Sequence, residues 1–173
     1  MGAVTAAFLR AAGQIPVERL SKNAIGAFDA AVQAVRAGEC VVVYPEGTLT
    51  RDPDLWPMVG KSGAARIALE TGAPVIPIGQ WGAHNLLYPY AKKLRPFPRK
   101  RIWMKVGDPV PLDDLAAVQP RTLQVINEAT ARIMEALTAL VADLRDEKAP
   151  LERFDPRKAG LRQTGNPSKK ERP

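Results

Sequence analysis

The chain has 173 residues, the length of one ordinary domain, and 46% of them are hydrophobic, which is enough to form a core. Its 25 Lys and Arg residues against 18 Asp and Glu give a formal charge of +7, which favours acidic partners such as phosphorylated substrates or anionic membranes. A single cysteine excludes an intramolecular disulfide. No apolar stretch approaches the roughly 20 residues of a membrane span, so we expect a soluble or peripheral protein.

The first predicted elements are a short extended piece and a helix. Residues 13–19 are expected to be extended, because the residue before a proline avoids the helical region. Ser21 or Asn23 can cap the helix that follows, in which apolar residues recur at helical spacing on one face. Gly38 is expected to end this helix in the left-handed conformation that glycine adopts readily.

The next elements predict a βαβ unit. Residues 40–44 form a continuous apolar run, typical of a strand buried on both faces, and this makes Cys40 a buried structural thiol. A helix is expected over residues 62–71 and a second apolar strand over residues 74–79, where Pro77 implies an edge, a bulge or a strand end. This order of elements implies a parallel or mixed sheet that is covered by helices.

The rest of the chain predicts one strand, one long helix and a tail. Residues 102–106 alternate in polarity as a half-exposed strand does, and residues 123–144 carry an apolar stripe at helical spacing. From residue 146 onward Pro, Gly, Lys and Arg dominate. We therefore expect an α/β domain over residues 1–145, with a mixed or mainly parallel sheet flanked by helices, and a disordered basic tail over residues 146–173.

The residues best suited to bind a ligand follow the first predicted strand. Residues 45–48, Pro-Glu-Gly-Thr, place a carboxylate, a flexible glycine and a hydroxyl at the end of the strand where α/β sheets bind ligands. Gly47 lets a ligand approach the backbone, and Arg51 and Lys61 bracket the loop and can pair with phosphate. On composition alone, a plain strand-to-helix turn with Glu46 in solvent explains the same residues.

Four stretches together resemble the family of 1-acyl-glycerol-3-phosphate acyltransferases. The combination is more specific than any single stretch, and the resemblance extends over about residues 2–110. The four stretches are Gly-Gln-Ile-Pro-Val-Glu-Arg at 13–19, Tyr-Pro-Glu-Gly-Thr-Leu-Thr-Arg at 44–51, Gly-Lys-Ser-Gly-Ala at 60–64 and Ala-Pro-Val-Ile-Pro-Ile at 73–78.

The resemblance implies a binding site for a phosphorylated acceptor. Arg19 matches an arginine that contacts the phosphate of the acceptor. Leu49 replaces the arginine that usually follows Glu-Gly-Thr, so the phosphate is left to Arg51 and Lys61. The fourth motif, at residues 74–78, is expected to form a wall of the site. The substrate-binding residues assigned in this way are Arg19, Glu46, Gly47, Thr48, Arg51 and Lys61.

The catalytic pair of the family is an Asn-His followed, after four residues, by Asp, on the N-terminal side of the second motif. Its histidine would act as general base on the acceptor hydroxyl, oriented by the aspartate, with no metal or cofactor. The twelve residues before Gly13 contain neither His nor Asp, so we expect this pair to lie upstream of Met1 and assign no catalytic residue here. The only histidine, His84, is either a surrogate base or, more simply, a polar loop residue.

Three functions remain open at this point. The first is transfer of a fatty acyl group from acyl-CoA or acyl carrier protein to lysophosphatidic acid or a related acceptor, in phospholipid biosynthesis at the cytoplasmic face of the membrane. The second is an incomplete family member that binds phospholipid or acyl chain without turnover. The third is a basic peripheral membrane adaptor without acyl chemistry.

One basic cluster bears on the choice of partner. The six cations from Lys92 to Arg101 are interleaved with aromatic residues and no acidic residue, which suits an anionic lipid surface as well as it suits a solvated loop. No recognised nucleic-acid-binding motif accompanies the cluster, so we expect no nucleic-acid partner.

Overall fold

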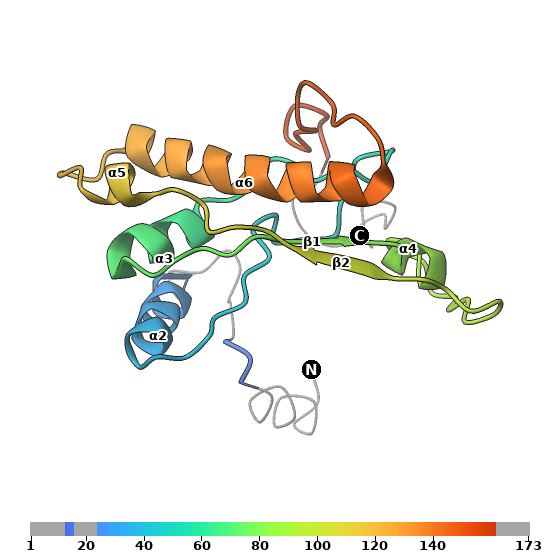
Figure 1. Cartoon of the computed structure of the whole chain (residues 1–173), viewed down its shortest axis with the longest axis horizontal. Helices are drawn as coiled ribbons and strands as arrows, with labels where there is room; N and C mark the ends of the chain where they lie inside the picture. The colour runs from blue at the N-terminus through green and yellow to red at the C-terminus, as the bar shows by residue number, and fades with distance from the viewer. Residues whose placement is uncertain (1–12, 16–23, 162–173) are drawn as a thin grey trace, which may run out of the picture. The chain divides into compact units, whose positions relative to one another are not determined.

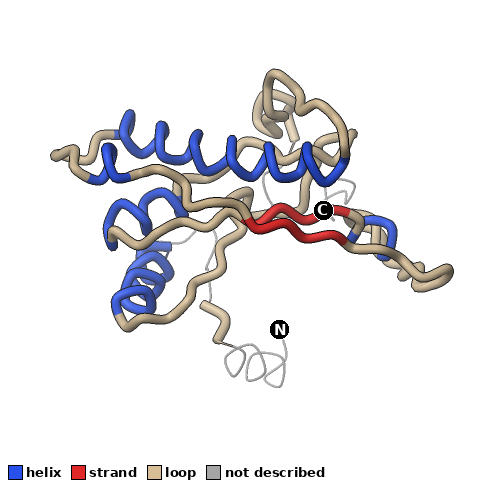
Figure 2. Tube along the Cα trace, viewed as in Figure 1, coloured by secondary structure: helices blue, strands red, loops and turns tan. Residues whose placement is uncertain are grey.

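The computed structural model describes residues 13–15 and 24–161 (Figure 1). The chain divides into two compact units, residues 1–43 and residues 44–173. Helices make up most of the regular structure, and the described strands belong to one small sheet (Figure 2). The elements are α2 (Ala24–Arg36), α3 (Gly63–Thr71), β1 (Ile78–Trp81), α4 (Ala83–Leu86), β2 (Trp103–Val106), α5 (Asp113–Ala116) and α6 (Leu123–Arg145).

The first unit contains helix α2, which ends where its sequence predicts. Gly38 has a φ of 83°, and the Glu39 N–H donates to the Ala34 carbonyl at 3.0 Å. The chain therefore leaves the helix through a left-handed glycine, and a carbonyl of the last turn is satisfied. The prediction for Gly38 is confirmed. Ser21 and Asn23, the expected caps of the first turn, lie outside the described residues.

Residues 40–44 form no strand, so this prediction was wrong. Val42 and Tyr44 are 74% and 79% exposed, and Cys40 is exposed rather than a buried structural thiol. An apolar run becomes a buried strand only where neighbouring strands satisfy its backbone, and none of the described strands pairs with this segment. The predicted βαβ unit is therefore not formed in the described part of the chain.

The sheet consists of β1 and β2, which pair antiparallel, and this corrects the predicted mixed or mainly parallel sheet. Ile78 pairs with Val106, and the register continues along both strands. β1 begins four residues later than the strand expected over 74–79, because the prolines of that stretch have no N–H to donate to a ladder. The Pro77 carbonyl still accepts a hydrogen bond from the Gly107 N–H at 2.9 Å.

Helix α6 packs against one face of this sheet (Figure 1). The close approach depends on Gly79 in β1, where a Cβ would lie only 2.7 Å from the Cβ of Leu140 on the helix. Lys105 of β2 points to the same face and forms an ion pair with Asp143 of α6. Met104, the neighbour of Lys105, points to the opposite face and is 66% exposed.

Helix α6 has 23 residues and ends one residue later than the predicted helix. The side chain of Thr122 accepts the Val125 N–H and caps the first turn, and Asp146 ends the helix with a φ of 53°. No helix in the described parts of the chain is long and apolar enough to cross a membrane.

The core of the second unit lies between α3, α5 and α6. Ala65 and Leu69, one turn apart on α3, and Ile133 of α6 are at most 3% exposed. Removing one of the larger side chains from such a core costs about 2–5 kcal/mol. Helix α3 ends at Gly72, whose φ is 69°, so its bounds agree with the helix predicted over 62–71 to within one residue.

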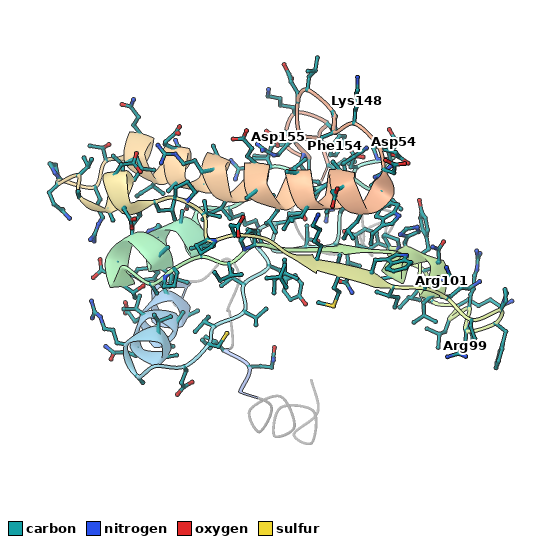
Figure 3. The ribbon with its side chains drawn as sticks, in the orientation of Figure 1. Asp54, Arg99, Arg101, Lys148, Phe154 and Asp155 are labelled. Carbon is teal, nitrogen blue, oxygen red and sulfur yellow. The ribbon has the colours of Figure 1, made fainter. Side chains whose placement is uncertain are left out.

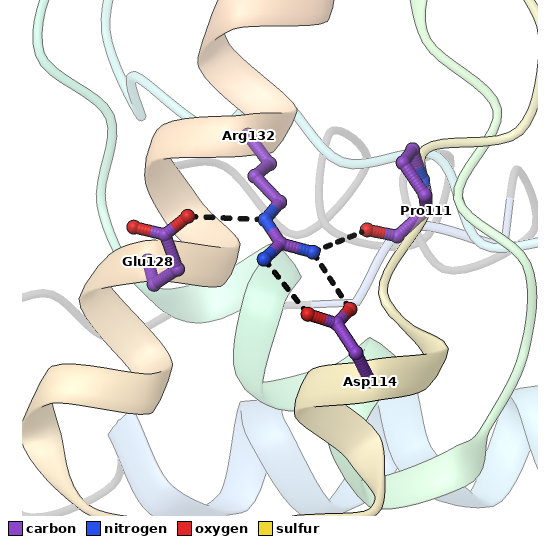
Figure 4. Close-up of polar contacts among 4 residues, drawn as sticks. All are labelled: Pro111, Asp114, Glu128 and Arg132. Carbon is purple, nitrogen blue, oxygen red and sulfur yellow. Dashed lines mark hydrogen bonds and ion pairs between the residues drawn. The ribbon is translucent and has the colours of Figure 1, made fainter.

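An arginine network holds α5 against α6 (Figure 4). Arg132 of α6 donates two hydrogen bonds to the carboxylate of Asp114 in α5, at 2.7 and 2.8 Å. It also donates to the Pro111 carbonyl and to Glu128, both at 3.0 Å. The hydrogen bonds from Arg132 lower the pKa of the Asp114 carboxyl below its ordinary value.

Residues 146–161 fold back over α6 (Figure 1), although we expected this stretch to belong to a disordered tail. The Val59 N–H donates to the carbonyl of Phe154 at 3.1 Å, so the returning segment bonds to the chain just before α3. A composition rich in Pro, Gly and basic residues does not reveal such a contact, because the two bonded residues lie far apart in the sequence. Residues 162–173 lie outside the described residues.

Candidate functional site

The Pro-Glu-Gly-Thr stretch forms a tight turn beside the segment that leads into α3. Gly47 has a φ of 66°, which few other residues tolerate, and its N–H donates to the Tyr44 carbonyl at 2.9 Å. The Lys61 N–H donates to the Pro45 carbonyl at 2.8 Å. A Cβ at Gly47 would lie 3.1 Å from the Lys61 Nζ, so the glycine also makes room for this side chain.

An open pocket of about 520 Å³ lies at this turn. Glu46, Thr48 and Lys61 line it, so the structure brings these three predicted site residues together. The pocket has a mixed lining of cations, carboxylates, an amide and hydroxyls, which can bind a polar ligand that carries both an anionic group and hydroxyls. Its other lining residues include Met58, Ser62, Asn127, Asp155 and Arg157.

Glu46 is the partly buried carboxylate of this pocket. Its Oε2 accepts the Met58 N–H at 2.9 Å, while its Oε1 has no hydrogen-bond partner among the described residues. Burial raises the pKa of Glu46 above its ordinary value, the Met58 N–H opposes this by stabilising the charged form, and the negative charge of Asp52 raises the pKa further. The carboxylate is thus fixed in position and easier to protonate than a solvated glutamate.

The loop between Glu46 and Met58 is organised by its own side chains. The Oδ1 of Asp52 accepts the N–H groups of Asp54 and Trp56 at 2.9 and 3.2 Å, as turn-forming aspartates do. The Thr50 hydroxyl donates to the Trp56 carbonyl at 2.8 Å. These bonds hold the Met58 N–H where Glu46 accepts it.

Arg51, a predicted phosphate partner, does not line the pocket. It is 8% exposed, and its Nε donates to the Tyr90 hydroxyl at 3.2 Å. The same hydroxyl donates to the Leu49 carbonyl at 3.1 Å and lies 3.3 Å from the Thr48 Oγ1. In this arrangement Arg51 supports the wall that carries Thr48 rather than facing a ligand.

Of the two remaining residues that the sequence analysis singled out, Arg19 and Leu49, the structure describes only Leu49. Arg19 lies outside the described residues. Leu49, which stands where the related family has an arginine, is 57% exposed.

The sequence did not indicate Tyr90 as part of the site, because no local pattern marks a residue that bonds to a turn about forty positions earlier. Nor did it indicate Asp155 and Arg157, which lie in the expected tail.

His84 lies on α4 and away from this pocket. Its ring centroid is 4.3 Å from that of Trp81, and the pocket lining does not include it. Burial lowers the pKa of His84 below its ordinary value, and the positive charge of Arg145 lowers it further. The arrangement favours a packing role for His84 over that of a surrogate base, although His84 lies in the short helix α4 and not in the predicted loop. In the described parts of the chain, no group of three or more His, Cys, Asp or Glu side chains is arranged to hold a metal ion.

The turn and the pocket lie in a part of the chain that is similar to known acyltransferases. Residues 2–81 match the family described as Acyltransferase. This match includes Glu46, Gly47, Thr48, Arg51 and Lys61, but not the returning segment at 146–161.

Two known proteins are similar to parts of the chain. The 1-acyl-sn-glycerol-3-phosphate acyltransferase BAT2, chloroplastic, of Brassica napus is 33% identical over 76 residues, which are 43% of this chain and 22% of that protein. The crystal structure of the 1-acyl-sn-glycerophosphate (LPA) acyltransferase PlsC from Thermotoga maritima superposes with a TM-score of 0.57 at 21% identity, over 84% of this chain and 53% of that one. The second likeness shows a shared fold, and the chain spans only about half of the Thermotoga protein.

Proposed function

We propose that this chain acts in phospholipid biosynthesis, in the transfer of a fatty acyl group from acyl-CoA or acyl carrier protein to 1-acyl-glycerol-3-phosphate or a related acceptor. The observation that carries the proposal is the pocket that Glu46, Thr48 and Lys61 line in a chain whose residues 2–81 match the Acyltransferase family. Both relatives are named as acyltransferases of acylglycerol phosphates, which supports the same class of acceptor.

The reaction requires an acceptor hydroxyl to be held close to a thioester. The hydroxyl oxygen forms an ester bond to the acyl carbonyl carbon, the carbon–sulfur bond breaks, and the hydroxyl proton is ultimately carried by the thiol that leaves. Orienting the two reactants accounts for much of the rate of such a step, and no metal is required for it.

The pocket suits the acceptor side of this reaction. Lys61 provides a cation for the phosphate, and Ser62, at the positive end of α3, also lines the pocket. The Oε1 of Glu46, which accepts no hydrogen bond from the described residues, can accept one from a glycerol hydroxyl. In this proposal Glu46 and Lys61 bind and orient the acceptor.

The test is an acyl-transfer assay of the chain with labelled acyl-CoA or acyl carrier protein and lysophosphatidic acid. Labelled phosphatidic acid is the expected product. Glu46→Ala and Lys61→Ala are expected to lower kcat/KM by about 10-fold or more each, since each removes a charge-assisted hydrogen bond. Glu135→Ala, on the exposed face of α6, is the matched control and should leave kcat/KM unchanged. Equal activity of the Glu46 and Glu135 variants would contradict the assignment.

A second candidate is binding of the acceptor without turnover. It is favoured by the placement of His84, the one histidine of the chain, outside the pocket. No histidine base is therefore available at the described pocket. Binding of lysophosphatidic acid, with no labelled product from either acyl donor, would support this candidate. Absence of both binding and product would contradict both functions.

We further propose that the chain acts as a peripheral protein at the inner face of the cell membrane and contacts anionic lipid through a basic loop at residues 87–101. Figure 3 shows Arg99 and Arg101 on this loop, which extends past α4. Its apolar side chains face solvent, with Leu94 55% and Phe97 84% exposed. Cations next to exposed aromatic and apolar side chains suit the interface of an anionic bilayer.

Vesicle sedimentation tests the basic loop. Vesicles with anionic lipid are expected to bind the chain, whereas zwitterionic vesicles bind it weakly. Lys92→Ser combined with Lys93→Ser should weaken binding, because each cation near an anionic surface contributes about 1 kcal/mol. Lys148→Ser combined with Lys158→Ser removes the same charge elsewhere and is the control. Equal loss of binding in the two double variants would refute a role for the loop.

A further inference from the structure

The segment that follows α6 reaches the pocket, and two hydrogen bonds fix its path. The Arg153 Nε donates to the hydroxyl of Thr138, a buried residue of α6, at 3.2 Å. The next residue, Phe154, accepts the Val59 N–H at 3.1 Å, and Val59 itself lines the pocket. Figure 3 shows Phe154 and Asp155 on this segment beside α6. The returning chain is therefore held against the pocket by contacts on both sides.

A turn then sets the position of residue 157. The Asp155 Oδ1 accepts the Arg157 N–H at 2.9 Å, and the Asp155 carbonyl accepts the Ala159 N–H at 3.2 Å. The Leu161 N–H closes the turn on the Pro156 carbonyl at 2.8 Å. Asp155, Pro156 and Arg157 all line the pocket, so the turn forms one of its walls.

The charges of the pocket are shared between this wall and the Pro-Glu-Gly-Thr turn. Lys61 and Arg157 are its cations, and Glu46 and Asp155 are its carboxylates. Each carboxylate already accepts a backbone N–H, whereas the guanidinium of Arg157 makes no hydrogen bond or ion pair with any described residue. A guanidinium in a pocket can bind a phosphate through two parallel hydrogen bonds, which an ammonium cannot do.

We propose that Arg157 binds the phosphate group of the ligand together with Lys61, so that the segment after α6 completes the binding site for a phosphorylated polyol. The inference rests on the proposed function for the class of ligand, and it adds a specificity residue that lies outside the matched family region. The two carboxylates of the pocket then accept hydrogen bonds from the hydroxyls of the polyol. Arg157 is a binding residue in this arrangement and has no part in the bond-making step.

Calorimetric titration of the 173-residue chain with glycerol 3-phosphate tests the inference. Arg157→Ala should weaken binding about 10-fold, the loss expected for one charge-assisted bidentate contact, and Arg157→Lys should recover only part of it. Lys158→Ala, a neighbouring surface cation that does not line the pocket, should change the Kd by less than about 2-fold. Because Arg157 is on the surface, circular dichroism should show the same fold for all three variants.

Three results would overturn the inference. The first is absence of glycerol 3-phosphate binding by the unaltered chain. The second is equal affinity of the Arg157→Ala and Lys158→Ala variants for glycerol 3-phosphate. The third is a loss of affinity for plain glycerol in Arg157→Ala that equals its loss of affinity for glycerol 3-phosphate. The acyl-transfer assay separates this inference from the proposed function. If binding depends on Arg157 but no product forms, the inference stands and the proposed function is rejected. If acyl transfer occurs and Arg157→Ala has an unchanged KM, the proposed function stands and the inference is rejected.

Discussion

The guanidinium of Arg145 lies 3.9 Å from the ring centroid of Trp56. It also lies 4.3 Å from the ring centroid of Trp81, so the last residue of α6 makes cation–π contacts with two tryptophans. The same group donates to the Asp54 carbonyl at 2.8 Å and pairs with Glu147, and its side chain is only 7% exposed. One arginine thus joins the end of α6 to strand β1 and to the loop that leads into the pocket.

Arg145→Ala should lower the free energy of unfolding by about 2–4 kcal/mol, because it removes two cation–π contacts and the hydrogen bond to the Asp54 carbonyl. Arg145→Lys keeps the charge but not the planar guanidinium, and should lose about half as much. Urea denaturation followed by circular dichroism measures both effects. Lys148→Ala, on the exposed segment nearby, should change stability by less than about 0.5 kcal/mol. A loss of less than about 0.5 kcal/mol of unfolding free energy in Arg145→Ala would show that the contacts with the two tryptophans contribute little.

The stability of the chain should depend on pH through Glu46. Since the folded state raises the pKa of Glu46, the protonated form favours folding. This contribution is complete below the unfolded pKa of about 4.3 and is lost as the pH rises through the folded pKa. Unfolding free energies of the unaltered chain and of Glu46→Gln, measured from pH 4 to pH 7, should therefore diverge as the pH rises, with the unaltered chain losing more. A constant difference between the two proteins across this range would mean that the pKa is not raised.

Two glycines beside the pocket should respond oppositely to alanine. A Cβ at Gly60 would lie 2.6 Å from the Cγ and Sδ of Met134, which is 2% exposed and has little room to move. Gly60→Ala should thus destabilise the chain by about 1–3 kcal/mol. Gly63, the first residue of α3, has nothing within 4 Å, and Gly63→Ala should leave the stability equal or raise it by up to about 1 kcal/mol. Equal destabilisation in urea would contradict the packing at Gly60.

The Arg132 network predicts the titration of Asp114. The carboxyl should titrate below the ordinary aspartate value of about 3.9 in a carbon NMR titration, and Arg132→Gln should raise its pKa toward that value. Because the folded pKa is lowered, the interaction stabilises the fold above pH 4 or so and is lost as the pH falls through the folded pKa. Glu147→Ala, beyond the C-terminal end of α6, should not move the Asp114 resonance. A normal pKa in the unaltered chain would rule out a lasting contact in solution.

Helices α3 and α6 were predictable because each carries its signals locally, whereas the short helices α4 and α5 were not predicted. Gly72 ends α3, and the apolar stripe of residues 123–144 defines α6 to within one residue. The strand predicted over residues 102–106 is confirmed at Trp103–Val106, but all four of its residues are exposed, so the predicted half-burial was wrong. Such features depend on neighbours a few positions away, which a sequence displays directly.

The sheet and the pocket could be predicted only in part. The apolar run at 40–44 suggested a strand, but strand formation requires a partner, and sequence periodicity does not supply one. Glu46, Thr48 and Lys61 were predicted because they are near one another in the chain. Tyr90 and Arg157 reach the same region from distant positions, and no local pattern indicates such contacts.

The returning segment has a practical consequence for anyone choosing where to cut this chain. A fragment that stops at Arg145 would keep all the helices and strands of the described residues, and its circular dichroism would look intact. Yet it would lack the turn at 155–157, so the ligand pocket would be left open on one side. Secondary-structure content is therefore a misleading criterion for the shortest functional piece, and binding of a phosphorylated ligand is the safer one.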